Sequence, residues 1–430
     1  MVIIIAMLNR LGIILERLMV IVVCLLLLTT GEPRPSDTID RVRAYTRDIE
    51  FDYIAWMLNA AGVKIQQGAT GVPGYLDNES GKVAVTTYLR VTQQIMQGEA
   101  ALNRVFADAS IKDKEAASVA IRAQLAGLYK QQTDLAPIAE AVLQKQVAAV
   151  AADFGLTTLG QPIPTILFHS SPVPNALIVS PRDHVEQIAN ISVLPDLTID
   201  QQAALEDQVQ NGLNVSALVV PIGGVGVYPT MIMCTTDLSW LIDTIAHEWT
   251  HNYLELRPLG LLYDHTPELR TMNETTADIS GTEIGAEVIK RYYPELKGAF
   301  LPDFDLVALP QNHPNPGDMP RPPFDFHTEM HTTRVNADSL MAAGKITEAE
   351  AYMEQRRQLF VKNGYTIRKL NQAYFAFYGA YADVPGGAAG EDPVGPAVRK
   401  LRDQSKSLAD FINRIAWMTS FDALKNAVGK

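Results

Sequence analysis

Two short motifs constrain what this chain can fold into more than any other feature of its sequence. The first is His247-Glu248-Trp249-Thr250-His251. On a helix, residues four apart lie one turn apart on the same side, so the two histidines can bind one metal ion. Glu248 follows the first histidine directly, and we expect its carboxylate to take a proton from a water held at the open position of that metal. The first motif therefore predicts a metal-binding helix with a general base beside the metal.

The second motif is the segment 273–278 (NETTAD), in which Glu274 lies 23 residues after the last histidine of the first motif. Glu274 can supply a third ligand and complete a set of two histidines and one carboxylate, which leaves one position open for water. Asp278, one turn further along, can accept the second N–H of a ligand histidine. Gly281 and Gly285 continue the same stripe. We expect these small residues to let the second helix pack closely against the first.

Together the two motifs resemble those of the gluzincin family, which comprises the thermolysin-like metallopeptidases and related aminopeptidases. The resemblance implies zinc as the cofactor, with His247, His251 and Glu274 as its ligands. It also implies that Glu248 is the general base and that Asp278 is the carboxylate that orients a ligand histidine. The expected activity is hydrolysis of peptide bonds by a water molecule that Glu248 activates.

The resemblance also implies an architecture. It is specific over about residues 235–290, and the segment 368–374 (RKLNQAY) resembles, less specifically, a bacterial group of predicted aminopeptidases. Members of the family place a small sheet before the two metal-binding helices, and the edge strand of that sheet binds extended substrate. We therefore expect an α+β fold: a gluzincin-type metallopeptidase core with a helical C-terminal part, preceded by a helical domain.

Composition and periodicity indicate where the elements lie. Residues 38–155 predict mostly helices, since alanine, glutamine and leucine dominate 91–153, and a glycine-rich break at 68–81 separates the helices. Short β-rich runs follow, and Pro229 within the last of them favours an edge strand. The β-rich runs are 163–169, 175–180, 215–221 and 225–233, and the metal-binding helices are expected over 236–256 and 273–292. The expected organisation is a signal or membrane anchor with linker (1–32), a helical domain (33–158) and a zinc metallopeptidase domain (159–430). Within the metallopeptidase domain we expect a small sheet (159–234), the zinc helices (235–293), a proline-rich loop (300–324) and a helical C-terminal part (325–430).

Two parts of the site stay open at this stage. Aminopeptidases of the family carry a glutamate on the edge strand that binds the free amine of the substrate, and the segment 222–233 has no acidic residue. Endopeptidase and aminopeptidase action are therefore both possible. The family also uses a downstream tyrosine or histidine to stabilise the oxyanion. The candidates here are Tyr381 and Tyr378, followed by Tyr374 and His331.

Two functions outside peptide hydrolysis also remain. One is a catalytically silent binding or scaffold protein on the same fold, and the other is a zinc hydrolase of a non-peptide amide or ester. A second histidine pair, His327 and His331, has no further ligand at a suitable spacing and predicts a solvated or loop-packing role. The formal net charge of −12 argues against nucleic acid as a partner, because phosphate binding needs clustered Lys and Arg. The expected partner is a peptide or protein substrate.

The N-terminal segment predicts export. Residues 18–28 (LMVIVVCLLLL) are apolar without interruption and follow Arg10 and Arg17, which is the order of a signal sequence. The apolar run is short for a membrane span of about 20 residues. No clear cleavage site follows it, so a cleaved signal and an uncleaved membrane anchor both remain open. In either case the rest of the chain is expected outside the cytoplasm, because the positive flank stays inside.

Overall fold

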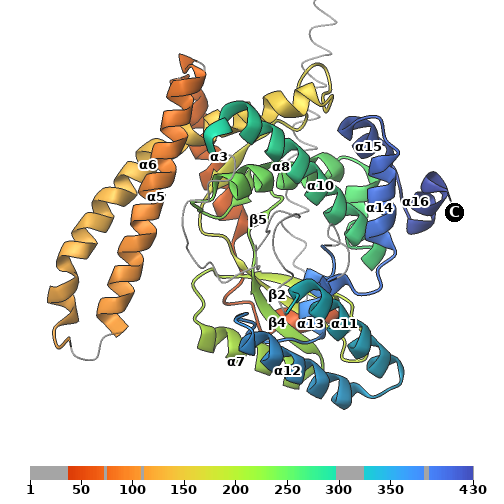
Figure 1. The fold of residues 1–430 in the computed structure, drawn as a ribbon. Coiled ribbons are helices and arrows are strands. Elements are labelled where there is room, and N and C mark those ends of the chain that lie inside the picture. The colour runs from red at the N-terminus through yellow and green to blue at the C-terminus, as the bar shows by residue number, and fades with distance from the viewer. Residues whose placement is uncertain (1–36, 72–74, 108–110, 297–323, 382–386, 430) are drawn as a thin grey trace, which may run out of the picture. The chain divides into compact units, whose positions relative to one another are not determined.

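The computed structural model describes residues 37–71, 75–107, 111–296, 324–381 and 387–429 (Figure 1). The chain divides into two compact units, Met1–Tyr45 and Thr46–Lys430. In the first unit the described element is helix α2 (Thr38–Arg43), which Asp37 caps by accepting a hydrogen bond from the Ile39 amide. All the other described elements belong to the second unit.

Two predicted segments lie outside the described residues. These are the apolar run of the expected signal or anchor and residues 300–323 of the expected proline-rich loop. Within the ranges that are described, no helix is both long enough and apolar enough to cross a membrane.

The second unit begins with three long helices, α3 (Tyr53–Thr70), α5 (Asn78–Ala107) and α6 (Lys114–Asp153). Asp113 caps α6 by accepting a hydrogen bond from the Ala116 amide, and alanine and leucine fill much of the helix that follows. α5 and α6 pack side by side along their lengths (Figure 1). The interruption predicted between the first two of these helices corresponds to the end of α3 at Gly71, which adopts a left-handed conformation.

Two three-stranded sheets follow. The first has the order β3-β2-β4 and is antiparallel, with β2 (Asn175–Ser180) at its centre between β3 (Ala189–Val193) and β4 (Ser216–Pro221). Helix α7 (Ile199–Leu213) connects β3 to β4. The second sheet has the order β1-β6-β5, in which β1 (Phe168–Ser170) runs parallel to β6 (Thr230–Ile232) and β5 (Gly224–Val225) runs antiparallel to β6.

The prediction of one small sheet was therefore wrong in two respects, of which the first is that the strands form two sheets. The run 225–233 does not form a single edge strand that contains Pro229, because it splits into the end of β5, a connection that contains this proline, and β6. Proline has no amide to donate, so it suits the connection better than a central strand such as β6. The strand at this edge of the sheet is β5, which is only two residues long.

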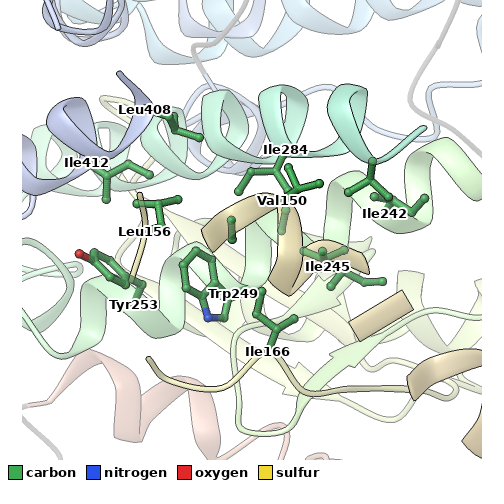
Figure 2. Packing of buried hydrophobic residues seen from close by; sticks show 14 of the residues in the cluster. Val150, Leu156, Ile166, Ile242, Ile245, Trp249, Tyr253, Ile284, Leu408 and Ile412 are labelled. Carbon is green, nitrogen blue, oxygen red and sulfur yellow. The ribbon is translucent and has the colours of Figure 1, made fainter. Parts of the chain in front are cut away.

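Helices α8 (Leu238–Glu255) and α10 (Pro267–Tyr292) follow the second sheet, with the short α9 (Pro258–Leu261) between them. Figure 2 shows apolar side chains of α8, such as Ile245 and Trp249, packed together with Ile284 of α10. The Trp249 ring is 2% exposed, and its Nε1 donates a 2.7 Å hydrogen bond to the Pro164 carbonyl. α10 begins six residues before the predicted start, because Thr266 caps it and Pro267 suits the first helical turn.

The C-terminal part is helical, as predicted. Its described elements are α11 (Phe326–Ala342), α12 (Ile346–Lys362), α13 (Gln372–Tyr378), η2 (Gly387–Ala389), α14 (Val394–Asp403), α15 (Leu408–Ile415) and α16 (Phe421–Val428), and the short η1 (Pro294–Leu296) precedes it after α10. α13 packs Ala373 and Phe377 against β2 and β4, whereas α14 and α15 contribute to the same core as α8 and α10. The α+β class is confirmed.

Candidate metal centre

Helices α8 and α10 approach each other closely enough to share a metal site. An ideal Cβ on Gly281 would lie 2.9 Å from the Asp243 carbonyl oxygen and 3.2 Å from the His247 Cβ, and one on Gly285 would lie 3.3 Å from the Asp243 Cα. A larger side chain at Gly281 would push the helices apart, because these neighbours belong to backbone and to a Cβ and cannot swing away. The expectation that small residues allow close packing here is confirmed.

Three potential ligand atoms converge between the two helices. The Nε2 atoms of His247 and His251 lie 3.0 Å apart. The Oε2 atom of Glu274 lies 3.7 Å from the first and 3.5 Å from the second. Zinc with bonds of about 2.0–2.1 Å in a tetrahedral site sets its ligand atoms roughly 3.3 Å apart, so these separations fit one ion. In the described part of the chain, this is the group of His, Cys, Asp and Glu side chains placed so that it could hold a metal.

The environment of Glu274 also fits a metal ligand. Its Oε2 atom is buried and has no hydrogen-bond partner within the described structure. A buried carboxylate oxygen without a partner is costly, and a metal ion at this point would satisfy it. The three side chains therefore can hold a metal ion.

A side-chain oxygen contacts the Nδ1 atom of each histidine and orients its ring. His247 Nδ1 lies 2.9 Å from Asp278 Oδ1, which is the contact expected from the sequence. His251 Nδ1 lies 2.7 Å from Asn273 Oδ1. An oxygen at each Nδ1 favours the tautomer that carries its proton there, which leaves each Nε2 lone pair free for a metal. The role of Asn273 was not assigned from the sequence, although its position next to Glu274 was the available signal.

The charges around the site favour a cation. Burial opposes a charge on His247, but the carboxylates of Asp278, Glu248 and Glu274 outweigh it and raise the pKa of this imidazole to about 10. Burial likewise opposes ionisation of Glu274, yet the neighbouring imidazoles hold its pKa down at about 2. Three carboxyl groups thus surround two imidazoles in a largely buried site, and added positive charge is stabilised there.

Glu248 lies beside the edge strand β5. Its side chain is 7% exposed, and burial raises its pKa above the usual value, although the two histidines oppose the shift. An ideal Cβ on Gly224 would lie 2.5 Å from Glu248 Oε1, and one on Gly226 would lie 3.2 Å from the His251 Cβ. The glycines therefore let the strand pass directly over the first motif.

Two further residues of the site were missed by the sequence analysis. The Tyr263 hydroxyl donates a hydrogen bond to Glu274 Oε1, so the oxygen of this carboxylate that faces away from the histidines is held in place. Arg270, one turn before Glu274 on α10, is 8% exposed and donates a 3.0 Å hydrogen bond to the Ala376 carbonyl of α13. Neither residue belongs to either sequence motif.

Of the oxyanion candidates, Tyr381 lies within electrostatic reach of Glu274 and Asp278. Burial and the charge of Glu274 raise the pKa of its phenol well above the usual value, and Asp278 adds to the shift. Tyr378 instead packs against Tyr374, with ring centroids 4.5 Å apart, and burial raises its pKa to about 12 without a contribution from the site. His331 lies elsewhere, with its Nε2 atom 3.4 Å from Glu391.

The second histidine pair does not form a metal group with Glu329, whose carboxylate accepts a hydrogen bond from Arg356. The pair lies on helix α11, where His327 is exposed, so neither histidine is part of a loop.

Replacing Asp278 by asparagine is expected to weaken metal binding by about 10–100-fold, because carboxylates that hydrogen-bond to ligand histidines typically contribute this much affinity. Titration with a competing chelator measures the change. The matched control is Asp200→Asn, which removes one exposed carboxylate from α7 and should leave the affinity unchanged. Equal affinities for the two variants would show that the contact with His247 does not support the site.

Comparison of this chain with protein-family models, with curated proteins and with solved structures finds no match.

Proposed function

We propose that this chain is an exported zinc-dependent peptidase. The observation that carries the proposal is the convergence of His247 Nε2, His251 Nε2 and Glu274 Oε2 on one point, with Glu248 beside it under an edge strand. Two imidazoles and one carboxylate are a donor set that zinc accepts, and they leave a coordination position open. Zinc bound there would polarise a carbonyl group and lower the pKa of water to about 7.

The residues of the chain then have separate tasks. Glu248 accepts the proton of the attacking water and passes it to the leaving amine. Its buried position, which raises its pKa, suits a group that must both take and return a proton near neutral pH. Asp278 and Asn273 hold the two imidazoles, and Tyr263 holds the carboxylate of Glu274.

The edge strand β5 supports a peptide as the substrate. β5 pairs with β6 on one side and is at the edge of its sheet on the other. An extended peptide can add to such an edge through main-chain hydrogen bonds, which would lay its carbonyls across Glu248. The strand has no acidic side chain to bind a free amine. We therefore propose that the enzyme cleaves within peptides and does not depend on a free N-terminus.

The test is cleavage of a peptide library by zinc-loaded protein, with each peptide present in free and N-acetylated form. We expect cleavage of both forms, loss of activity with a chelator, and recovery on adding zinc. Cleavage of the free forms alone would favour an aminopeptidase. Retention of zinc without cleavage of any peptide would contradict the proposal and favour a silent scaffold or a hydrolase of other amides or esters.

Replacing Tyr381 by phenylalanine is expected to lower kcat by about 10²–10³-fold with little change in KM, because a donor to the oxyanion acts mainly in the transition state. The matched control is Tyr378→Phe, which removes a hydroxyl three residues away on the same chain segment. Steady-state kinetics on one good peptide compares the two variants. A larger loss in Tyr378→Phe would transfer the proposed role to that residue.

Export is proposed on the sequence of the N-terminal segment alone. Protease treatment of intact spheroplasts tests it, since full protection of residues beyond 46 would place this unit inside the cell.

A further inference from the structure

Helix α3 exposes an apolar stripe. Ile54, Leu58 and Ile65 are 69%, 71% and 74% exposed. At about 100° per residue these three positions lie within roughly 40° of one another around the helix, so their side chains form one stripe. Large aliphatic groups exposed singly are common on proteins, but three on one helix face form a patch of the kind that usually contacts something.

The exposed surface of α3 also carries no charge. Lys64 is the one charged residue among the 18 of this helix. Its side chain is only 7% exposed, and its Nζ lies 2.5 Å from Glu140 Oε2 of α6. The remaining exposed positions are alanine, glycine, asparagine and glutamine. By contrast, 20% of the residues of the whole chain are charged, so an uncharged helix surface of this length is unusual for the molecule.

The opposite face of α3 makes polar contacts with the rest of the unit. These are Tyr53 Oη with Ser192 Oγ at 2.7 Å, Trp56 Nε1 with Ser171 Oγ at 2.9 Å, Lys64 with Glu140, and Gln67 Nε2 with the Pro137 carbonyl at 2.6 Å. At about 100° per residue all four positions fall in an arc of roughly 80° centred on the side away from the stripe. These four polar contacts hold α3 in the orientation in which the apolar stripe faces away from the rest of the unit.

We propose that the stripe of Ile54, Leu58 and Ile65 lies on the surface of a lipid bilayer, with α3 parallel to the membrane. An amphipathic helix of this kind buries its apolar side chains at the boundary between headgroups and acyl chains. The absence of charge on the exposed face makes neutral lipid a suitable surface, since no anionic headgroup is needed.

The position of α3 in the chain favours a bilayer over other occupants. α3 begins 25 residues after Leu28, the end of the apolar N-terminal run. A chain of that length spans at most about 90 Å when fully extended, so an anchored run would keep α3 close to the bilayer and raise its effective concentration there. The inference rests on the proposed export and membrane proximity, and it is independent of the metal site.

The experiment uses the full chain in phosphatidylcholine vesicles, with a nitroxide label on a single cysteine at position 54, 58 or 65. Cys24 is replaced by serine, and the same protein without an added cysteine reports any labelling of Cys234, whose thiol pKa burial raises to about 11. The matched control label replaces Ile199, an aliphatic residue that is 64% exposed at the start of α7. The measured quantity is the accessibility of each label to oxygen relative to a water-soluble nickel chelate.

We expect the ratio of oxygen to chelate accessibility at the three α3 positions to exceed that at position 199 by roughly tenfold, because oxygen concentrates in the hydrocarbon and the chelate is excluded from it. The ratio should not change with salt, since the face is uncharged. Ratios equal to the control would overturn the proposal. Protection from both reagents, with spin–spin broadening between labels, would overturn it in favour of a second copy of the chain. Cleavage of a soluble peptide tests the metal site separately, so the two failures are distinguishable.

Discussion

Replacing Glu248 by glutamine is expected to lower kcat for peptide hydrolysis by about two to four orders of magnitude, which is the usual contribution of one general acid–base group. Glutamine preserves the size of the side chain, so it can occupy the same space under Gly224. It cannot accept a proton from the attacking water. The zinc content should stay at the parental level, because the three ligand atoms belong to other residues.

The comparison needs zinc content and single-turnover rates for the parent and the variant. Glu268→Gln is the control, since Glu268 is an exposed carboxylate in the first turn of the neighbouring helix α10. We expect this control to keep the parental rate. A Glu248→Gln protein that retains zinc and cleaves peptides at near-parental rates would rule out the proposed mechanism, whereas loss of zinc would show that Glu248 supports the metal site.

The sequence predicted the centre of the site because its chemistry lies in short local patterns. His247 and His251 lie on one helix, and Glu274 and Asp278 lie on another, so helical periodicity alone states which side chains share a face. The contributions of Tyr263 and Arg270 could not be predicted in this way. Tyr263 lies in the connection between α9 and α10, and Arg270 contacts α13 about a hundred residues later in the chain.

In the fold, too, local features could be predicted from the sequence and long-range ones could not. Helix α8 was predicted to within two residues of both ends, because its apolar periodicity is local, whereas α10 begins six residues before its predicted start. The pairing of strands is not local, so the separation into two sheets was missed. Helix α7 was also not predicted, although Thr198 and Gln201 form a capping box at its start, and that pair is visible in the sequence.

Replacing Glu274 by alanine is expected to weaken zinc binding by more than about 100-fold, since loss of a group behind a ligand already costs about 10–100-fold. The substitution has a second effect that must be separated from the first. Arg270 is nearly buried beside Glu274, and removal of the carboxylate leaves that positive charge poorly compensated. The metal-free variant should therefore unfold at a lower temperature than the metal-free parent.

The informative quantity is the change in the unfolding midpoint that zinc causes in each protein. Zinc at about 100 times its Kd stabilises the parent by about 2.7 kcal/mol, whereas a variant whose Kd exceeds the zinc concentration gains almost nothing. Glu268→Ala removes an exposed carboxylate from the first turn of the same helix and should keep the parental increase. Glu274→Gln retains an acceptor for the Tyr263 hydroxyl, so it shows how much of the zinc effect depends on the charge. If Glu274→Ala keeps the full zinc-dependent increase, the histidines hold the metal with another group, and the contact between Tyr263 and Glu274 serves packing alone.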